Sequence, residues 1–84
     1  MAVQDDTPMA SVRCRTRTGQ LSHIRTVDRA IRYIDTELEG PMAEQPDFRA
    51  AKAALHQVLQ GKISIDQARA SFVAALKDAN VFVP

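Results

Sequence analysis

The first regular pattern in the chain is an alternation of polar and apolar residues that begins at Ser11. An extended segment there places small or β-branched side chains on one face and arginines on the other: Val12, Cys14 and Thr16 against Arg13, Arg15 and Arg17. A period of two with β-branched residues predicts a β-strand. Thr18-Gly19 is a turn signal, and a second strand is expected from Leu21 to about Arg25. The sequence therefore predicts an N-terminal β-hairpin.

The turn residues decide the register of this hairpin. A two-residue type I′ loop requires positive φ at Thr18, which a β-branched residue resists. A three-residue loop over residues 17–19 requires it only at Gly19, where it costs nothing. The longer loop pairs Val12 with Ile24, so that the two apolar side chains share a face. The outer face is then polar and basic apart from one leucine: Arg13, Arg15, Arg17, Leu21, His23 and Arg25.

Three later segments carry apolar residues at helical spacing. We expect helices over about residues 26–39, 47–60 and 64–79. Thr26 is a suitable N-cap for the first, and Ser64-Ile65-Asp66-Gln67 has the capping-box form at the start of the third. These elements predict an α+β fold of order ββααα.

The ends of the chain are assigned separately. Residues 1–10 lack periodicity and are expected to form a disordered tail, so that one domain covers residues 11–83. Asn80 is a natural C-cap for the last helix. The apolar segment Val81-Phe82-Val83 after it either packs on the helices or adds a short C-terminal edge strand. Since a two-stranded hairpin is not stable alone, its apolar face must lie on the helices.

The cysteine count and the lack of long apolar segments indicate the cellular compartment. Cys14 is the single cysteine among 84 residues, so no intrachain disulfide is possible, and we expect it to be a small core residue. The sequence shows no signal-peptide pattern and no apolar run of membrane-spanning length. We therefore expect a cytoplasmic protein with no membrane partner.

The charges are unevenly distributed although the whole chain has a net charge of only +1. Residues 11–33 carry six arginines and one acid, a net charge of +5. Five acids then follow without an intervening base: Asp35, Glu37, Glu39, Glu44 and Asp47. Two interpretations stay open: complementary surfaces, including surfaces of two copies, or a solvated surface whose charges fell unevenly.

The sequence gives little support to a catalytic site or a metal site. Ser22 and His23 are adjacent, and neighbours on a strand point to opposite sides, so they form no dyad. The three glycines are dispersed and form no phosphate loop. The soft metal-ligand candidates Cys14, His23 and His56 have no zinc-site spacing. We expect no catalytic residues, no metal and no cofactor.

A binding surface is the remaining candidate for function, and it consists of Arg13, Arg15, Arg17, His23 and Arg25. It could be no more than the solvated face of the hairpin. Arginine suits phosphate binding, and two-stranded ribbons enter nucleic-acid grooves. The face lacks an aromatic residue for stacking, however, and the net charge is low. We therefore expect an interaction or regulatory module for a protein partner, with a homodimer included, and keep a nucleic-acid-binding accessory protein as the alternative.

Several segments of the chain occur with a familiar spacing. They are Val12-Arg13-Cys14, the turn residue Gly19, Ile24-Arg25-Thr26-Val27-Asp28-Arg29-Ala30, Leu59-Gln60-Gly61 and Ala68-Arg69-Ala70-Ser71-Phe72-Val73-Ala74-Ala75. In this spacing the chain resembles, over roughly residues 11–83, the small proteobacterial proteins of the family called domain of unknown function 982. The resemblance implies the fold derived above and brings no known activity or functional residues.

Overall fold

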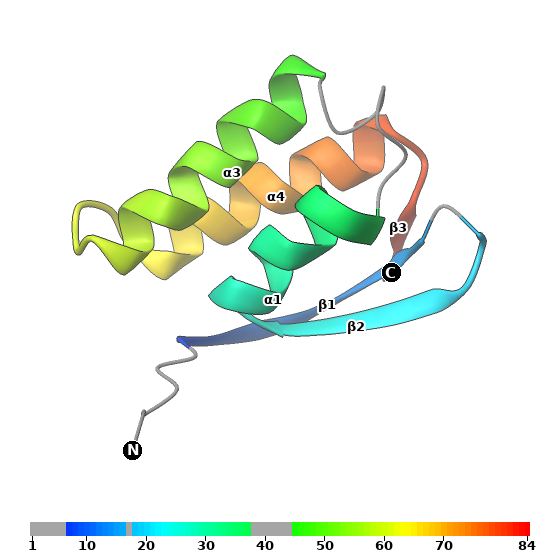
Figure 1. Ribbon diagram of the computed structural model, residues 1–84, viewed down its shortest axis with the longest axis horizontal. Helices are drawn as coiled ribbons and strands as arrows, with labels where there is room; N and C mark the ends of the chain where they lie inside the picture. Colours follow the sequence, from blue (N-terminus) through cyan, green and yellow to red (C-terminus); the bar gives the residue numbers. More distant parts are fainter. Residues whose placement is uncertain (1–6, 17, 38–44) are drawn as a thin grey trace.

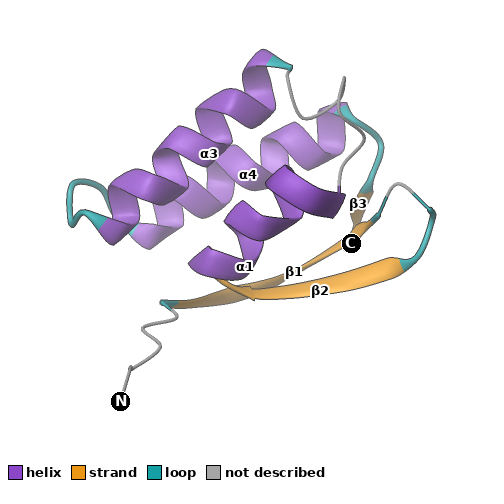
Figure 2. Ribbon diagram, in the orientation of Figure 1, coloured by secondary structure: helices purple, strands orange, loops and turns teal. Residues whose placement is uncertain are grey.

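The computed structural model describes residues 7–16, 18–37 and 45–84. Its elements in chain order are β1 (Pro8–Arg15), β2 (Leu21–Thr26), α1 (Val27–Arg32), the π-helical turn η1 (Tyr33–Glu37), α3 (Pro46–Leu59), α4 (Ile65–Asp78) and β3 (Phe82–Val83). The predicted α+β class, with a hairpin, helices and a short C-terminal strand, is confirmed (Figures 1 and 2).

The sheet has three antiparallel strands in the order β2-β1-β3. The C-terminal strand pairs with β1, so that Phe82 lies beside Cys14 and Val83 beside Arg13. The helices cover one face of the sheet and leave the other face uncovered in the view of Figure 1. The first strand is therefore central, and β2 forms one edge of the sheet.

The predicted hairpin register is confirmed. Val12 lies opposite Ile24, and the Thr16 N–H donates to the Gln20 oxygen at 2.8 Å, so three residues form the connection. Gly19 has a φ of +88°, and its N–H donates to the Thr16 oxygen at 2.9 Å. This left-handed conformation is the one that the three-residue loop requires of a glycine.

The first strand begins at Pro8, three residues before the predicted start at Ser11. Pro8 lies opposite Thr26, and the Val27 N–H donates to the Thr7 oxygen at 2.8 Å. The register shifts between Pro8 and Val12, which is an irregularity of the β-bulge kind. The bulge breaks the period of two, and for this reason the alternation starts later than the strand. Residues 1–6 of the predicted tail lie outside the described residues.

The first helix differs from the continuous α-helix predicted over residues 26–39. Thr26 caps it as expected by accepting from the Arg29 N–H at 3.1 Å, but α1 ends at Arg32 and the wider turn η1 follows. Two consecutive residues of η1, Tyr33 and Ile34, are buried. The wider turn therefore follows from packing and not from local helix propensity. Residues 38–39 lie outside the described residues.

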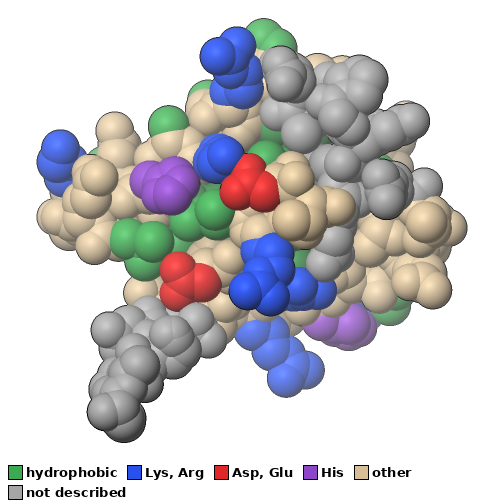
Figure 3. Space-filling view, in the orientation of Figure 1, with side chains coloured by type: hydrophobic (Ala, Val, Ile, Leu, Met, Phe, Trp, Pro, Cys, Tyr) green, Lys and Arg blue, Asp and Glu red, His purple; other side chains and the backbone are tan. Residues whose placement is uncertain are grey.

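The two longer helices follow their local signals. Pro46 opens α3 at its first position, where a missing N–H costs nothing. Both bonds of the predicted capping box are present at 3.2 Å, between Ser64 and Gln67. Asn80 has a φ of +62°, in agreement with its predicted capping role. On the side shown in Figure 3, the helices carry basic and acidic side chains in mixture.

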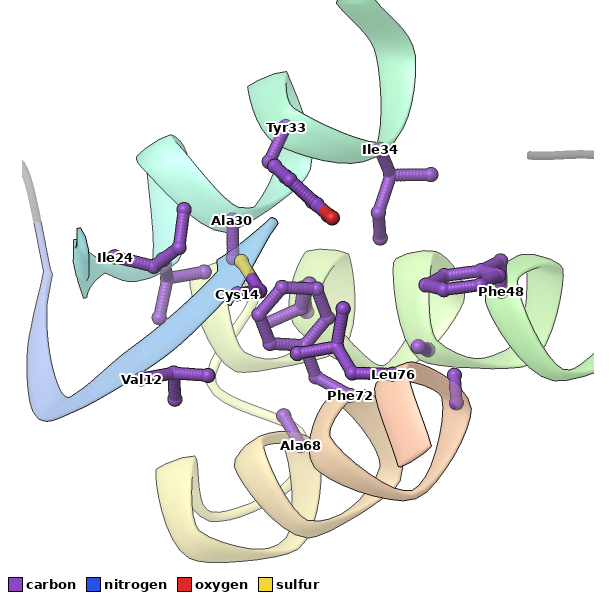
Figure 4. Close-up of a cluster of buried hydrophobic side chains, with 14 residues drawn as sticks. Val12, Cys14, Ile24, Ala30, Tyr33, Ile34, Phe48, Ala68, Phe72 and Leu76 are labelled. Carbon is purple, nitrogen blue, oxygen red and sulfur yellow. The ribbon is translucent and has the colours of Figure 1, made fainter. Parts of the chain in front are cut away.

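The core lies between the sheet and the helices (Figure 4). Phe72 of α4 is fully buried, and its ring meets the Tyr33 ring edge-on at 6.0 Å. The Tyr33 hydroxyl donates to the Arg15 oxygen at 2.5 Å, which ties η1 to the central strand. Cys14 is fully buried, and its prediction as a core residue is confirmed.

Candidate binding surface

The face of the sheet that points away from the helices carries the predicted binding residues. Arg13, Arg15, His23 and Arg25 are exposed, and we call these four residues the basic sheet face. Their neighbours along the strands are buried in the core: Val12, Cys14, Ser22 and Ile24. The fifth predicted residue, Arg17, lies outside the described residues.

The strand register brings these side chains together. Arg13 lies directly opposite His23, and Arg15 lies opposite Leu21. Directly opposed side chains on one face of an antiparallel pair are about 5 Å apart at their Cβ atoms. The sequence has neither an acidic nor an aromatic residue between Pro8 and Thr26. The hairpin therefore presents a continuous basic surface without an internal counter-charge.

Two of the arginines are held by main-chain oxygens. The Arg13 guanidinium donates to the oxygen of Pro84, and Arg15 Nη1 donates to the oxygen of Gly19 at 3.2 Å. Among the described residues, no aspartate or glutamate side chain is shown in an ion pair with the basic sheet face. An ion pair on the helical side joins Lys52 to Asp35 at 2.5 Å. These contacts orient the two arginine side chains on the sheet face.

A surface cavity of about 440 Å³ adjoins this face at the uncovered part of the β1 edge. Arg13 and His23 line it from the sheet, and Arg69 lines it from α4. Arg69 donates to the Ala10 and Ser11 oxygens, each at 3.1 Å. Its guanidinium therefore takes the main-chain acceptors that β3 is too short to reach.

The candidates for metal binding do not come together. Cys14 is buried on the inner face of the sheet, His23 is on the outer face, and His56 is exposed on α3. Within residues 7–16, 18–37 and 45–84, no three His, Cys, Asp or Glu side chains are placed to hold a metal ion. In the same part of the chain, no helix is long and apolar enough to span a bilayer.

The acidic run predicted from Asp35 to Asp47 is divided in the structure. Asp35 pairs with Lys52, whereas Asp47 at the start of α3 interacts with Asp78 at the end of α4. Glu39 and Glu44 lie outside the described residues. The hydrogen bond to Asp78, the charge of Asp78 and slight desolvation together raise the pKa of the Asp47 carboxyl. This pair was not predicted from the sequence. The signal for it is that an antiparallel α3–α4 hairpin brings the start of one helix beside the end of the other.

We expect Asp78→Asn to stabilise the domain at neutral pH. A carboxyl whose folded pKa is raised destabilises the fold once it ionises, so this cost is absent at low pH and appears as pH rises through its unfolded and then its folded pKa. Asp78 also lies at a helix C-terminus, where negative charge is unfavourable. The urea midpoint of the variant should therefore exceed that of the wild type by a margin that grows from about pH 3 to pH 7.

Asp47→Asn is the matched control for this pair. It removes the same repulsion but also a favourable charge in the first turn of α3. Its urea midpoint should therefore rise less than that of Asp78→Asn. Because both carboxyls are at the surface, 1 M salt should reduce the gain of Asp78→Asn. If the difference in urea midpoint between Asp78→Asn and the wild type does not change with pH, repulsion between Asp47 and Asp78 is not its cause.

Comparison with known protein families gives a match over most of the chain. Residues 11–83 match the family described as "Protein of unknown function (DUF982)". No curated protein and no solved structure matches the sequence significantly. The match covers nearly the whole described fold, from the alternating part of β1 to the end of β3. The chain therefore belongs to the DUF982 family, as the segments from Val12 to Ala75 indicate.

Proposed function

We propose that this protein is a small non-enzymatic interaction or regulatory module of the cytoplasm that binds a protein partner through the basic sheet face. One observation carries the proposal. Arg13, Arg15, His23 and Arg25 share an exposed face of the sheet that contains no acidic residue. The partner surface that fits such a face is acidic.

The arrangement of the arginines favours binding over simple solvation. A guanidinium can donate two parallel hydrogen bonds to a carboxylate. The contacts of Arg13 with Pro84 and of Arg15 with Gly19 already restrict the two side chains, so less conformational entropy is lost when a partner binds. Leu21, which is 48% exposed, supplies apolar area beside them.

A protein partner fits these features better than a nucleic acid. Single strands are held by aromatic stacking, and the hairpin has no aromatic residue. Non-specific binding to duplexes depends on many phosphate contacts, and the net charge of +1 gives little long-range attraction. Nucleic-acid binding stays the alternative and is decided by the same experiment.

The test compares two variants that each lose two positive charges. Arg13→Ala/Arg25→Ala changes the basic sheet face, and Arg49→Ala/Lys62→Ala changes exposed positions on and after α3. Native complexes from the source cell are separated by size. The wild type and the α3 variant should form a complex with an acidic protein, and the face variant should not.

Two outcomes would contradict the proposal. If the face variant keeps the same partner, the basic sheet face is not the contact. If the wild type instead retains DNA or RNA with a steep dependence on salt, and the face variant loses this retention, the face binds nucleic acid.

A further inference from the structure

We infer that the segment recognised by this module is an acidic chain in extended conformation, which pairs with β2 (Leu21–Thr26) as a fourth strand of the sheet. This inference rests on the proposed function and adds the form of the partner to it. Strand addition of this kind obtains affinity from main-chain hydrogen bonds and specificity from the side chains at the edge.

The main-chain groups of β2 provide the first argument. Thr16 and Gln20 form a hydrogen-bonded pair, and in an antiparallel ladder such pairs alternate with pairs that are not bonded. The N–H and C=O groups of Leu21 and His23 therefore point away from β1. The Arg15 N–H, which belongs to the non-bonded pair with Leu21, accordingly donates to Val81 on the other side of β1 at 2.8 Å. The sheet order places no strand of the described chain beyond β2.

The charges on both sides of this edge provide the second argument. His23 and Arg25 flank it on the outer face of the sheet. On the helical side, two cavities of about 330 and 150 Å³ adjoin the Leu21 and Thr26 ends of β2. Arg29 lines both of them, and Arg32 and the acidic Asp28 also line the smaller one. Figure 3 shows basic side chains gathered over α1 and the sheet edge below it. Since successive side chains of an added strand point to opposite faces, acidic residues on either face would meet an arginine.

The same charges argue against a second copy as the occupant. Antiparallel pairing of β2 with β2 of another copy would place the arginines of two basic sheet faces on the same side of one continuous sheet. Like charges brought together on one face of a sheet are destabilising. An acidic segment with an apolar residue to cover Leu21 fits the edge without this cost.

A pair of synthetic peptides separates main-chain pairing from charge attraction. The first is an eight-residue peptide of alternating glutamate and valine, and the second is the same peptide with every peptide nitrogen methylated, so that neither of its edges keeps a donor. Both carry the same charge, but the methylated peptide loses the donors needed for pairing. We expect the first peptide to slow hydrogen exchange at the Leu21 and His23 amides at least tenfold, and the second to bind roughly tenfold more weakly because several hydrogen bonds are lost.

Two variants at one position give a second measurement on the full chain. His23→Pro removes an N–H that points away from β1, so the ladder keeps its bonds, whereas His23→Thr keeps the N–H and removes the imidazole. The threonine variant measures the loss of the imidazole alone. The proline variant should bind the first peptide at least tenfold more weakly than the threonine variant, because the proline variant also lacks the N–H that pairs with the peptide.

The outcomes are distinguishable from those of the proposed function. Equal binding of the two peptides, or no binding of either, overturns strand addition even if the Arg13→Ala/Arg25→Ala comparison supports the basic sheet face. Preference for a DNA oligonucleotide over the first peptide overturns both. The peptide comparison uses only wild-type protein, so it is decisive even if the proline variant fails to fold.

Discussion

The Phe72→Ala variant is expected to lose about 3–5 kcal/mol of unfolding free energy, the usual cost of removing a buried aromatic ring. Phe72 is fully buried where α4 meets the sheet and η1, and its ring contacts the Tyr33 ring. The chain has four aromatic residues in all, so no other large ring can refill the space. Domains of this size have a total stability of roughly 4–12 kcal/mol. The variant should therefore populate the unfolded state at 25 °C or lie close to doing so.

Urea unfolding followed by circular dichroism measures this loss, and Phe82→Ala is the matched control. Phe82 is partly buried on β3, with Lys77 Nζ 5.4 Å from its ring centre. The same truncation there removes less buried area and leaves less of a cavity, so its cost should be clearly smaller. Equal losses at the two positions would show that Phe72 does not hold the centre of the core.

The features that could be predicted from the sequence depend on local chemistry. The hairpin register follows from what Thr18 and Gly19 can adopt in a turn, and the start of α4 follows from the reciprocal bonds of Ser64 and Gln67. The outward position of the arginines in β1 and β2 follows from the period of two alone. Each of these signals lies within a few residues of the structure that it specifies.

The features that could not be predicted depend on contacts between distant segments. The early start of β1 rests on a bulge, and the π-helical turn at Tyr33 rests on packing against Phe72. The pairing of β3 with β1 decides which strand is central, and periodicity contains no information on it. The same pairing supplies the Pro84 oxygen that holds Arg13 and leaves β2 as the edge. The composition of the candidate surface was therefore predictable, but its boundary was not.

Reversing the charge of the basic sheet face should have the largest effect on binding. In Arg13→Glu/Arg25→Glu, two favourable contacts with an acidic partner become repulsive. Removing one member of a close charge pair at an interface typically costs 2–5 kcal/mol, so affinity for the partner should fall by at least about a hundredfold. Both side chains are exposed, and thermal unfolding should show that the variant still folds.

Arg49→Glu/Lys62→Glu changes the net charge by the same amount away from the sheet, and it should keep most of the affinity. Salt dependence then separates local from global repulsion. Added salt should weaken the wild-type complex, because screening at 0.1 M acts over about 10 Å and reduces the attraction between exposed charges. In the reversed variant the remaining contacts act against repulsion, so screening should strengthen its residual binding. If both double variants respond to salt alike, the partner senses only the overall charge, and the basic sheet face is not the surface that it contacts.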